Sequence, residues 1–83
     1  MDLTLYMPES AFSAMRLAPE EFARELRIAA AAKWYELALV SQEKAAEIAG
    51  LSRSEFLMEL GRFKVSPFQV TAAELEEELR HAD

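Results

Sequence analysis

With 83 residues, the chain is long enough for one small domain, whose core is marginal unless a second chain or a partner adds buried area. The absence of cysteine excludes disulfides and thiolate metal sites, and it fits a reducing cytoplasm, where we expect the protein to reside. Fifteen acidic against nine basic residues give a net charge of −6, which argues against a chain that binds nucleic acid through a broad basic surface.

The charge is unevenly distributed along the chain. Residues 65–83 contain five acidic residues and one basic residue, whereas residues 41–64 contain four of each. The acidic end would repel a phosphate backbone. The start has no basic leader followed by an apolar run, and Lys33 and Glu36 interrupt the most apolar region. We therefore expect neither a signal peptide nor a membrane span.

Residues suited to catalysis or metal binding are scarce. The chain has one histidine, His81, together with two glycines and no cysteine. A lone histidine forms neither a catalytic triad nor a histidine-based metal cluster, and two glycines do not make a phosphate-binding loop. We therefore expect no enzyme activity, no cofactor and no metal site.

The first element predicted is a short strand over residues 2–7. Leu3, Leu5 and Met7 would share one face of this strand, and Pro8 would end it. The strand could pair with its copy in a dimer. A short helix is expected next, capped by Ser10 and running to about residue 16.

A long helix is predicted from Pro19 to about Leu39, because proline suits the first turn and no glycine or further proline follows until Gly50. Two apolar stripes run along it, so we expect burial on two sides. It is either a central core helix or a core helix whose second side contacts another chain. The first stripe is Phe22, Leu26, Ala29, Ala30, Lys33 and Leu37, and the second is Ile28, Ala31, Ala32, Tyr35 and Leu39.

The most informative pattern lies in residues 42–63, where the spacing is typical of a helix-turn-helix. Ser41 is a suitable N-cap for a helix over Gln42–Ala49, and Gly50 suits the left-handed position that follows. Ser52 and Glu55 have the spacing of a capping box before a helix from Arg53 to about residue 63. Two crossed helices also need small residues at the crossing and apolar residues after the turn, which the chain supplies as Ala45, Ala46, Ala49, Leu51 and Phe56.

Two functions fit this helix pair. It either packs a small helical domain or a partner, or it places its second helix in a major groove of DNA. Arg53 is the typical base reader, whereas Glu55 and Glu59 would repel phosphate. The candidate DNA-binding residues are Ser52, Arg53, Ser54, Arg62 and Lys64.

The end of the chain is expected to be an extended segment followed by an acidic helix. Pro67 favours extended backbone before it, and Thr71 and Glu74 form a second capping-box pattern before a helix over about residues 72–81. We divide the chain into a helical core, residues 1–64, and a partner-binding end, residues 65–83. Candidate partner-binding residues are Phe63, Val65, Phe68, Val70, Leu75 and Leu79, and candidate dimer-interface residues are Leu3, Leu5, Trp34 and Tyr35. Trp34 and Tyr35 lie in the middle of a helix, where aromatic pairs usually belong to the core, although one of them can anchor an interface.

The chain resembles a family of small prokaryotic proteins, long catalogued as uncharacterised, that are now grouped with VapB-type antitoxins. The matching stretches are residues 21–27 (EFARELR), 33–36 (KWYE) and 44–56 (KAAEIAGLSRSEF), with the Val-Ser-Pro segment at 65–67 and the acidic end. Ser54 departs from the family pattern, in which tryptophan is common, so an aromatic anchor is missing from this helix.

The resemblance implies a mainly helical protein that inhibits a PIN-domain ribonuclease toxin by covering its acidic metal site or its RNA path. It also implies a homodimer that binds operator DNA. From residues and resemblance together, we expect an antitoxin-like interaction protein. The alternative is a helix-turn-helix DNA-binding regulator that acts without a toxin.

Overall fold

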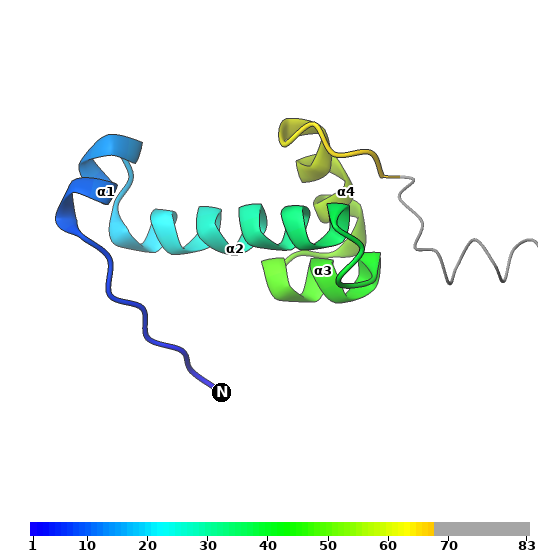
Figure 1. Cartoon of the computed structure of the whole chain (residues 1–83), viewed down its shortest axis with the longest axis horizontal. Coiled ribbons are helices and arrows are strands. Elements are labelled where there is room, and N and C mark those ends of the chain that lie inside the picture. The colour runs from blue at the N-terminus through cyan, green and yellow to red at the C-terminus, as the bar shows by residue number, and fades with distance from the viewer. Residues whose placement is uncertain (68–83) are drawn as a thin grey trace, which may run out of the picture.

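The computed structural model describes residues 1–67, which form four helices. They are α1 (Glu9–Met15), α2 (Pro19–Glu36), α3 (Gln42–Ala49) and α4 (Arg53–Arg62). Figure 1 shows α2 as the long axis, with α1 at its N-terminal end and α3 and α4 packed at its C-terminal end. The prediction of a mainly helical protein is confirmed for this part of the chain. None of its helices is both long enough and apolar enough to cross a membrane.

The strand predicted over residues 2–7 is absent. Residues 1–8, called here the N-terminal arm, have no regular secondary structure, and all their side chains are exposed. Figure 1 shows the arm leaving α1 and extending away from the helices. A strand is stable only when it pairs with a neighbouring strand, and residues 1–67 contain no strand that could be its partner. An alternating pattern was therefore not sufficient to specify one.

Local signals place the ends of α3 and α4 where they were predicted. The Ser41 hydroxyl accepts a hydrogen bond from the Lys44 amide at 3.1 Å and caps α3. Ser52 and Glu55 form the complete capping box at the start of α4. Gly50 separates the two helices at φ +72°, in the left-handed region that it was expected to adopt.

Every helix among residues 1–67 is followed by a residue with left-handed backbone. After α3 this residue is Gly50, but after α1, α2 and α4 it is Arg16, Ala38 and Lys64, with φ between 55° and 61°. The turn at Ala38 ends α2 at Glu36, before the predicted limit near Leu39. Residues other than glycine adopt this backbone conformation at a cost in free energy, because their Cβ atom crowds the carbonyl oxygen that follows it.

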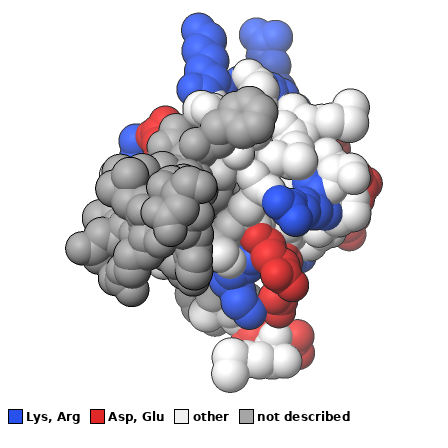
Figure 2. All heavy atoms as spheres, turned by 90° about the vertical axis from the view of Figure 1, so that its right-hand side faces the viewer, with Lys and Arg blue, Asp and Glu red and all other residues white. Residues whose placement is uncertain are grey.

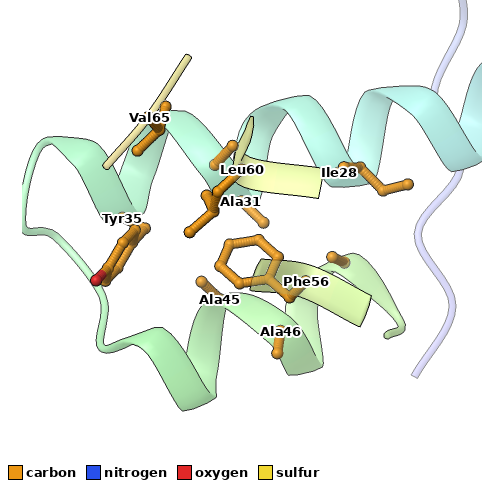
Figure 3. Close-up of a cluster of buried hydrophobic side chains, with 10 residues drawn as sticks. Ile28, Ala31, Tyr35, Ala45, Ala46, Phe56, Leu60 and Val65 are labelled. Atoms are coloured by element: carbon orange, nitrogen blue, oxygen red, sulfur yellow. The ribbon is translucent and has the colours of Figure 1, made fainter. Parts of the chain in front are cut away.

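The core lies where α2, α3 and α4 meet. Phe56 of α4 is 0% exposed, and Figure 3 shows its ring between α2 and α3. The ring meets Tyr35 of α2 edge to face, with centroids 6.1 Å apart. Alanines at the crossing allow α3 to approach α2 closely. The buried residues are Ile28, Ala31, Ala32 and Tyr35 of α2, Ala45, Ala46 and Ala49 of α3, Phe56 and Leu60 of α4, and Val65.

Only one of the two apolar stripes of α2 is buried within residues 1–67. The stripe that starts at Ile28 forms the core, except for Leu39, which lies beyond the helix and is exposed. The stripe that starts at Phe22 has no fully buried member, and Leu26 and Leu37 on it are exposed. Expecting burial on both sides was therefore wrong for this part of the chain.

Candidate functional site

The exposed start of α4 carries three of the candidate DNA-binding residues. Ser52 is occupied by the capping box: its hydroxyl accepts from the Glu55 amide at 3.1 Å, and its amide donates to Glu55 Oε1 at 2.9 Å. The hydrogen bond from the Ser52 amide lowers the pKa of the Glu55 carboxyl, with a further contribution from the Ser52 hydroxyl. Arg53 and Ser54 are exposed beside this cap. An acidic group therefore stays ionised next to the proposed base reader.

A hydrogen-bonded clamp holds Arg53 and the end of the described chain together. Arg53 Nε donates to Gln42 Oε1 at 2.7 Å. Gln42 Nε2 donates to the Pro67 carbonyl at 3.0 Å and to Tyr35 Oη at 3.2 Å, and Tyr35 Oη donates to the same carbonyl at 3.0 Å. Three helices thus fix the point from which residues 68–83 begin, and this point lies next to Arg53.

The far end of α4 carries Arg62 and Lys64. The Arg62 guanidinium makes two hydrogen bonds of 2.9 Å to the Glu25 carboxylate, a third of 2.7 Å to Glu59, and lies 4.8 Å from the centre of the Phe63 ring. The bonds to Glu25 raise the pKa of Arg62. Because ten helical residues span about 15 Å, this end is separated from Arg53. The candidate DNA-binding residues therefore form two groups rather than one site.

The candidate partner-binding residues are only partly within the described chain. Phe63 is half-buried, and the side chain of Val65 is buried in the core. The Val65 amide donates a hydrogen bond to the Leu60 carbonyl at 3.0 Å, which holds this segment against the end of α4. Val65 therefore supports the body of the protein and is not free to contact a partner. The other four, Phe68, Val70, Leu75 and Leu79, lie outside the described residues.

The candidate dimer residues lie in three different settings. Leu3 and Leu5 are exposed on the N-terminal arm, and Trp34 is 43% exposed on α2. Tyr35 is 5% exposed and packs against Phe56, so its assignment to a dimer surface is corrected: it is a core residue. The structure does not bring the arm leucines and Trp34 into one patch.

Comparison with known proteins identifies the family to which the chain belongs. The uncharacterised protein family UPF0175 matches residues 1–83. The chain belongs to this family. It is 41% identical over 56 residues to a UPF0175 protein of Aeropyrum pernix, a match that covers 68% of this chain and 71% of that protein. No solved structure matches the chain.

Three site residues of this UPF0175 member were not predicted from the sequence. Glu25 pairs with Arg62 across 37 positions, and Gln42 organises the clamp. Arg27 Nε donates to the Ile48 carbonyl at 2.9 Å and so binds the last turn of α3. Sequence spacing within one helix gives no signal for such contacts between helices.

The face shown in Figure 2 has no basic nucleic-acid groove on its described part. On the described part of the face shown in Figure 2, basic and acidic side chains alternate, with no continuous basic area. Among the described residues, Lys33 forms an ion pair with Glu36 at 2.7 Å and Lys44 forms one with Glu47 at 2.9 Å. Residues 1–67 also contain no group of three side chains placed to share a metal ion.

Proposed function

We propose that this UPF0175 member is a VapB-type antitoxin, a non-catalytic cytoplasmic protein that binds a PIN-domain ribonuclease toxin and blocks its activity. In this proposal α3, the turn at Gly50 and α4 form a helix-turn-helix within a rigid body, and residues 68–83 make the inhibitory contact. Support comes from the antitoxin resemblance of residues 21–27 and 44–56 and from the way the body anchors the acidic end.

The observation that carries the proposal is the clamp at Pro67. The carbonyl of Pro67 accepts hydrogen bonds from Tyr35 and Gln42, so the acidic end starts from a fixed place on the helical body. Residues 68–83 contain five acidic residues and one basic residue. An acidic segment presented in this way is suited to a basic groove that normally accepts RNA, because its carboxylates replace the phosphates.

Inhibition would therefore occur by occlusion. The acidic end occupies the RNA path of the toxin, while the helical body prevents the substrate from entering beside it. Anchoring matters because a tethered segment meets its site at a high effective concentration once the body is bound. This mechanism needs no chemistry from the antitoxin, only a charge match and a fixed starting point.

The test is co-expression with the product of the neighbouring gene, which the proposal expects to be a PIN-type nuclease. We expect the two proteins to co-purify at physiological salt and the complex to show no ribonuclease activity. Replacement of Glu74, Glu76, Glu77 and Glu78 by glutamine should restore ribonuclease activity, whereas replacement of Glu43 and Glu47 on α3 by glutamine should not. Recovery of the wild-type chain alone, or full inhibition by the tail variant, would contradict the proposal.

A second candidate function is a helix-turn-helix regulator that acts on DNA without a toxin. It is favoured by one observation: Arg53 is exposed at the start of α4, the part of a recognition helix that meets base edges, and Gln42 orients it. A salt-dependent gel shift on the chain's own promoter would support it. Arg53→Ala should then abolish DNA binding, while the glutamine substitutions in the tail leave DNA binding unchanged. The antitoxin proposal predicts instead that the tail substitutions abolish toxin inhibition and that Arg53→Ala leaves it unchanged.

A further inference from the structure

Gln42 joins two parts of the molecule that serve different purposes in the proposed functions. Its oxygen Oε1 accepts a hydrogen bond from Arg53 Nε at 2.7 Å, and its nitrogen Nε2 donates to the Pro67 carbonyl at 3.0 Å. Arg53 is the candidate base reader at the start of α4, and Pro67 is the last described residue before the acidic end. One side chain at the start of α3 therefore contacts both.

A side-chain amide is suited to making these two contacts at once. The Arg53 guanidinium is a donor without an acceptor, and the Pro67 carbonyl is an acceptor without a donor, so the group between them must offer one of each. The amide of Gln42 carries its oxygen and its nitrogen on one planar group, which fixes their relative directions. Rotation of this amide by half a turn would set nitrogen against the guanidinium and oxygen against the carbonyl. Both contacts therefore favour the same orientation of the amide.

Tyr35 reinforces this orientation from the core. Its ring is 5% exposed and packs against Phe56, and Figure 3 shows the Tyr35 hydroxyl at the edge of the buried cluster. The hydroxyl donates to the Pro67 carbonyl at 3.0 Å and accepts from Gln42 Nε2 at 3.2 Å. The carbonyl, the hydroxyl and the amide nitrogen thus form a triangle of hydrogen bonds. The position of Pro67 is therefore transmitted to the amide of Gln42.

The remainder of the Arg53 guanidinium is available to a ligand. Arg53 is exposed, and among residues 1–67 its guanidinium makes no hydrogen bond other than the one to Gln42. Because Nε is occupied, the two terminal nitrogens remain to make a bidentate contact with the edge of a guanine. An arginine side chain that is not held in this way has many rotamers to lose on binding. Gln42 is thus a positioning residue for Arg53.

We propose that Gln42 couples the anchor of the acidic end at Pro67 to the orientation of Arg53. While Tyr35 and Gln42 hold the Pro67 carbonyl, the Gln42 amide presents its oxygen to Arg53 and fixes the guanidinium. When a ligand draws the chain at Pro67 off the body, the amide is free to rotate, and Arg53 loses its fixed direction. The effect is reciprocal, because two sites that share one equilibrium shift each other by the same factor.

The coupling rests on the proposed function, which gives the two ends different ligands: a basic protein groove for residues 68–83 and, in the second candidate function, a DNA base edge for Arg53. Binding of the acidic end that lifts Pro67 then weakens the contact of Arg53 with DNA. One hydrogen bond changes an equilibrium roughly two- to tenfold, which sets the size of the effect. This is small beside the contribution of several carboxylates, so Arg53→Ala still leaves toxin inhibition intact.

The coupling is tested on the full-length chain alone, so the outcome depends on neither a toxin nor DNA. The first measurement is hydrogen exchange at the Val65 amide, which is protected while the segment that ends at Pro67 lies on the body. Arg53→Ala removes the contact on the other side of Gln42, and we expect it to speed this exchange roughly two- to tenfold. Ser54→Ala is the matched control: Ser54 is exposed on the same turn of α4, and its substitution should leave the rate unchanged.

The second measurement follows the coupling in the opposite direction. Tyr35→Phe removes a hydrogen bond to the Pro67 carbonyl, and we expect it to speed exchange of the Arg53 Nε proton, followed by NMR, roughly two- to tenfold. The Nε proton of Arg27 is the internal control, because it is bonded to the Ile48 carbonyl and takes no part in the clamp. Its exchange should not change.

Gln42→Glu separates coupling from the simple loss of a contact. A carboxylate still accepts from Arg53 Nε but cannot donate to the Pro67 carbonyl. The Arg53 Nε proton should therefore stay protected while the Val65 amide exchanges faster. Adding Tyr35→Phe to this variant should no longer affect Arg53. Circular dichroism checks that every variant keeps its helices.

Two results would overturn the coupling. One is Arg53→Ala protein that exchanges at Val65 as the wild type does, and the other is Tyr35→Phe protein whose Arg53 Nε proton exchanges at the wild-type rate. Failure of a toxin to co-purify contradicts the proposed function instead, and it changes neither of these rates.

Discussion

At the scale of single residues, the turn between α3 and α4 depends on the left-handed backbone of Gly50. It adopts φ +72°, and a Cβ added there would lie 3.0 Å from the guanidinium nitrogens of Arg27. We expect Gly50→Ala to lower the free energy of unfolding by about 1–2 kcal/mol, mainly because of the left-handed backbone, since the arginine side chain can move. Urea denaturation measures the change.

Gly61 provides the matched control for this prediction. It lies within α4, and a Cβ there would have no atom within 4 Å. Gly61→Ala should therefore raise the free energy of unfolding by about 0.5–1 kcal/mol, because alanine is the better helix former. Equal effects of the two substitutions would show that the turn does not depend on the glycine.

Glu55 should make the stability of the protein fall in acid. Its pKa in the folded state is lowered below the ordinary value of 4.5 by the Ser52 hydrogen bonds, so the folded state favours the carboxylate. The contribution of Glu55 is complete above pH 4.5 and is lost as the pH falls through the lowered pKa. Glu55→Gln keeps the capping geometry without the titration.

The measurement is the melting temperature of the two proteins between about pH 7 and about pH 3, the range in which carboxyl groups titrate. Wild type should lose more stability than Glu55→Gln over the acidic part of this range. Parallel curves would mean that the capping box does not distinguish the carboxylate from the neutral side chain.

At the scale of elements, residues 63–67 are held to the body by hydrogen bonds and by the buried side chain of Val65. The Tyr35 hydroxyl donates to the Pro67 carbonyl, and the Val65 amide donates to the Leu60 carbonyl. Tyr35→Phe should cost about 0.5–1.5 kcal/mol and speed hydrogen exchange at the Val65 amide more than at Ala31. Tyr6→Phe, on the exposed arm, should change neither value. Unchanged exchange at Val65 would show that packing alone holds the segment.

Elements bounded by local signals were predictable, and those that depend on distant partners were not. Ser41, Gly50 and Ser52 act on amides or dihedral angles within four residues, so the limits of α3 and the start of α4 follow from the sequence. The strand over residues 2–7 would need a partner that the sequence pattern cannot supply. The Arg62–Glu25 pair joins residues 37 positions apart, and only packing of α4 on α2 brings them together.

The candidate site was predictable to a smaller extent. Arg53 lies exposed at the start of a helix, as predicted. Arg62 is paired with Glu59, which is three residues away on the same helix, and also with Glu25 of α2, a contact that no helical spacing indicates. Tyr35 and Trp34 are neighbours along the chain, and no sequence pattern decides which of them faces the core. The packing of Phe56 against Tyr35 decides it.

At the scale of the whole molecule, Trp34 is a natural probe of the homodimer that the sequence analysis predicts. It is the only tryptophan of the chain and is partly exposed on α2. Its fluorescence maximum should move to shorter wavelength as the protein concentration rises, and the melting temperature should rise in parallel, because association stabilises the folded state. A spectrum and a melting temperature that are independent of concentration would argue for a monomer.

The left-handed residues that follow α1, α2 and α4 have a consequence for abundance. Arg16, Ala38 and Lys64 each hold a conformation that costs about 1–2 kcal/mol in a chain whose isolated core is small. Such a chain gains stability from a protein that binds its folded state, which in the proposed function is the toxin. A cell that makes little toxin would hold a larger share of the chain unfolded and open to proteolysis, and a cell that makes more would protect it.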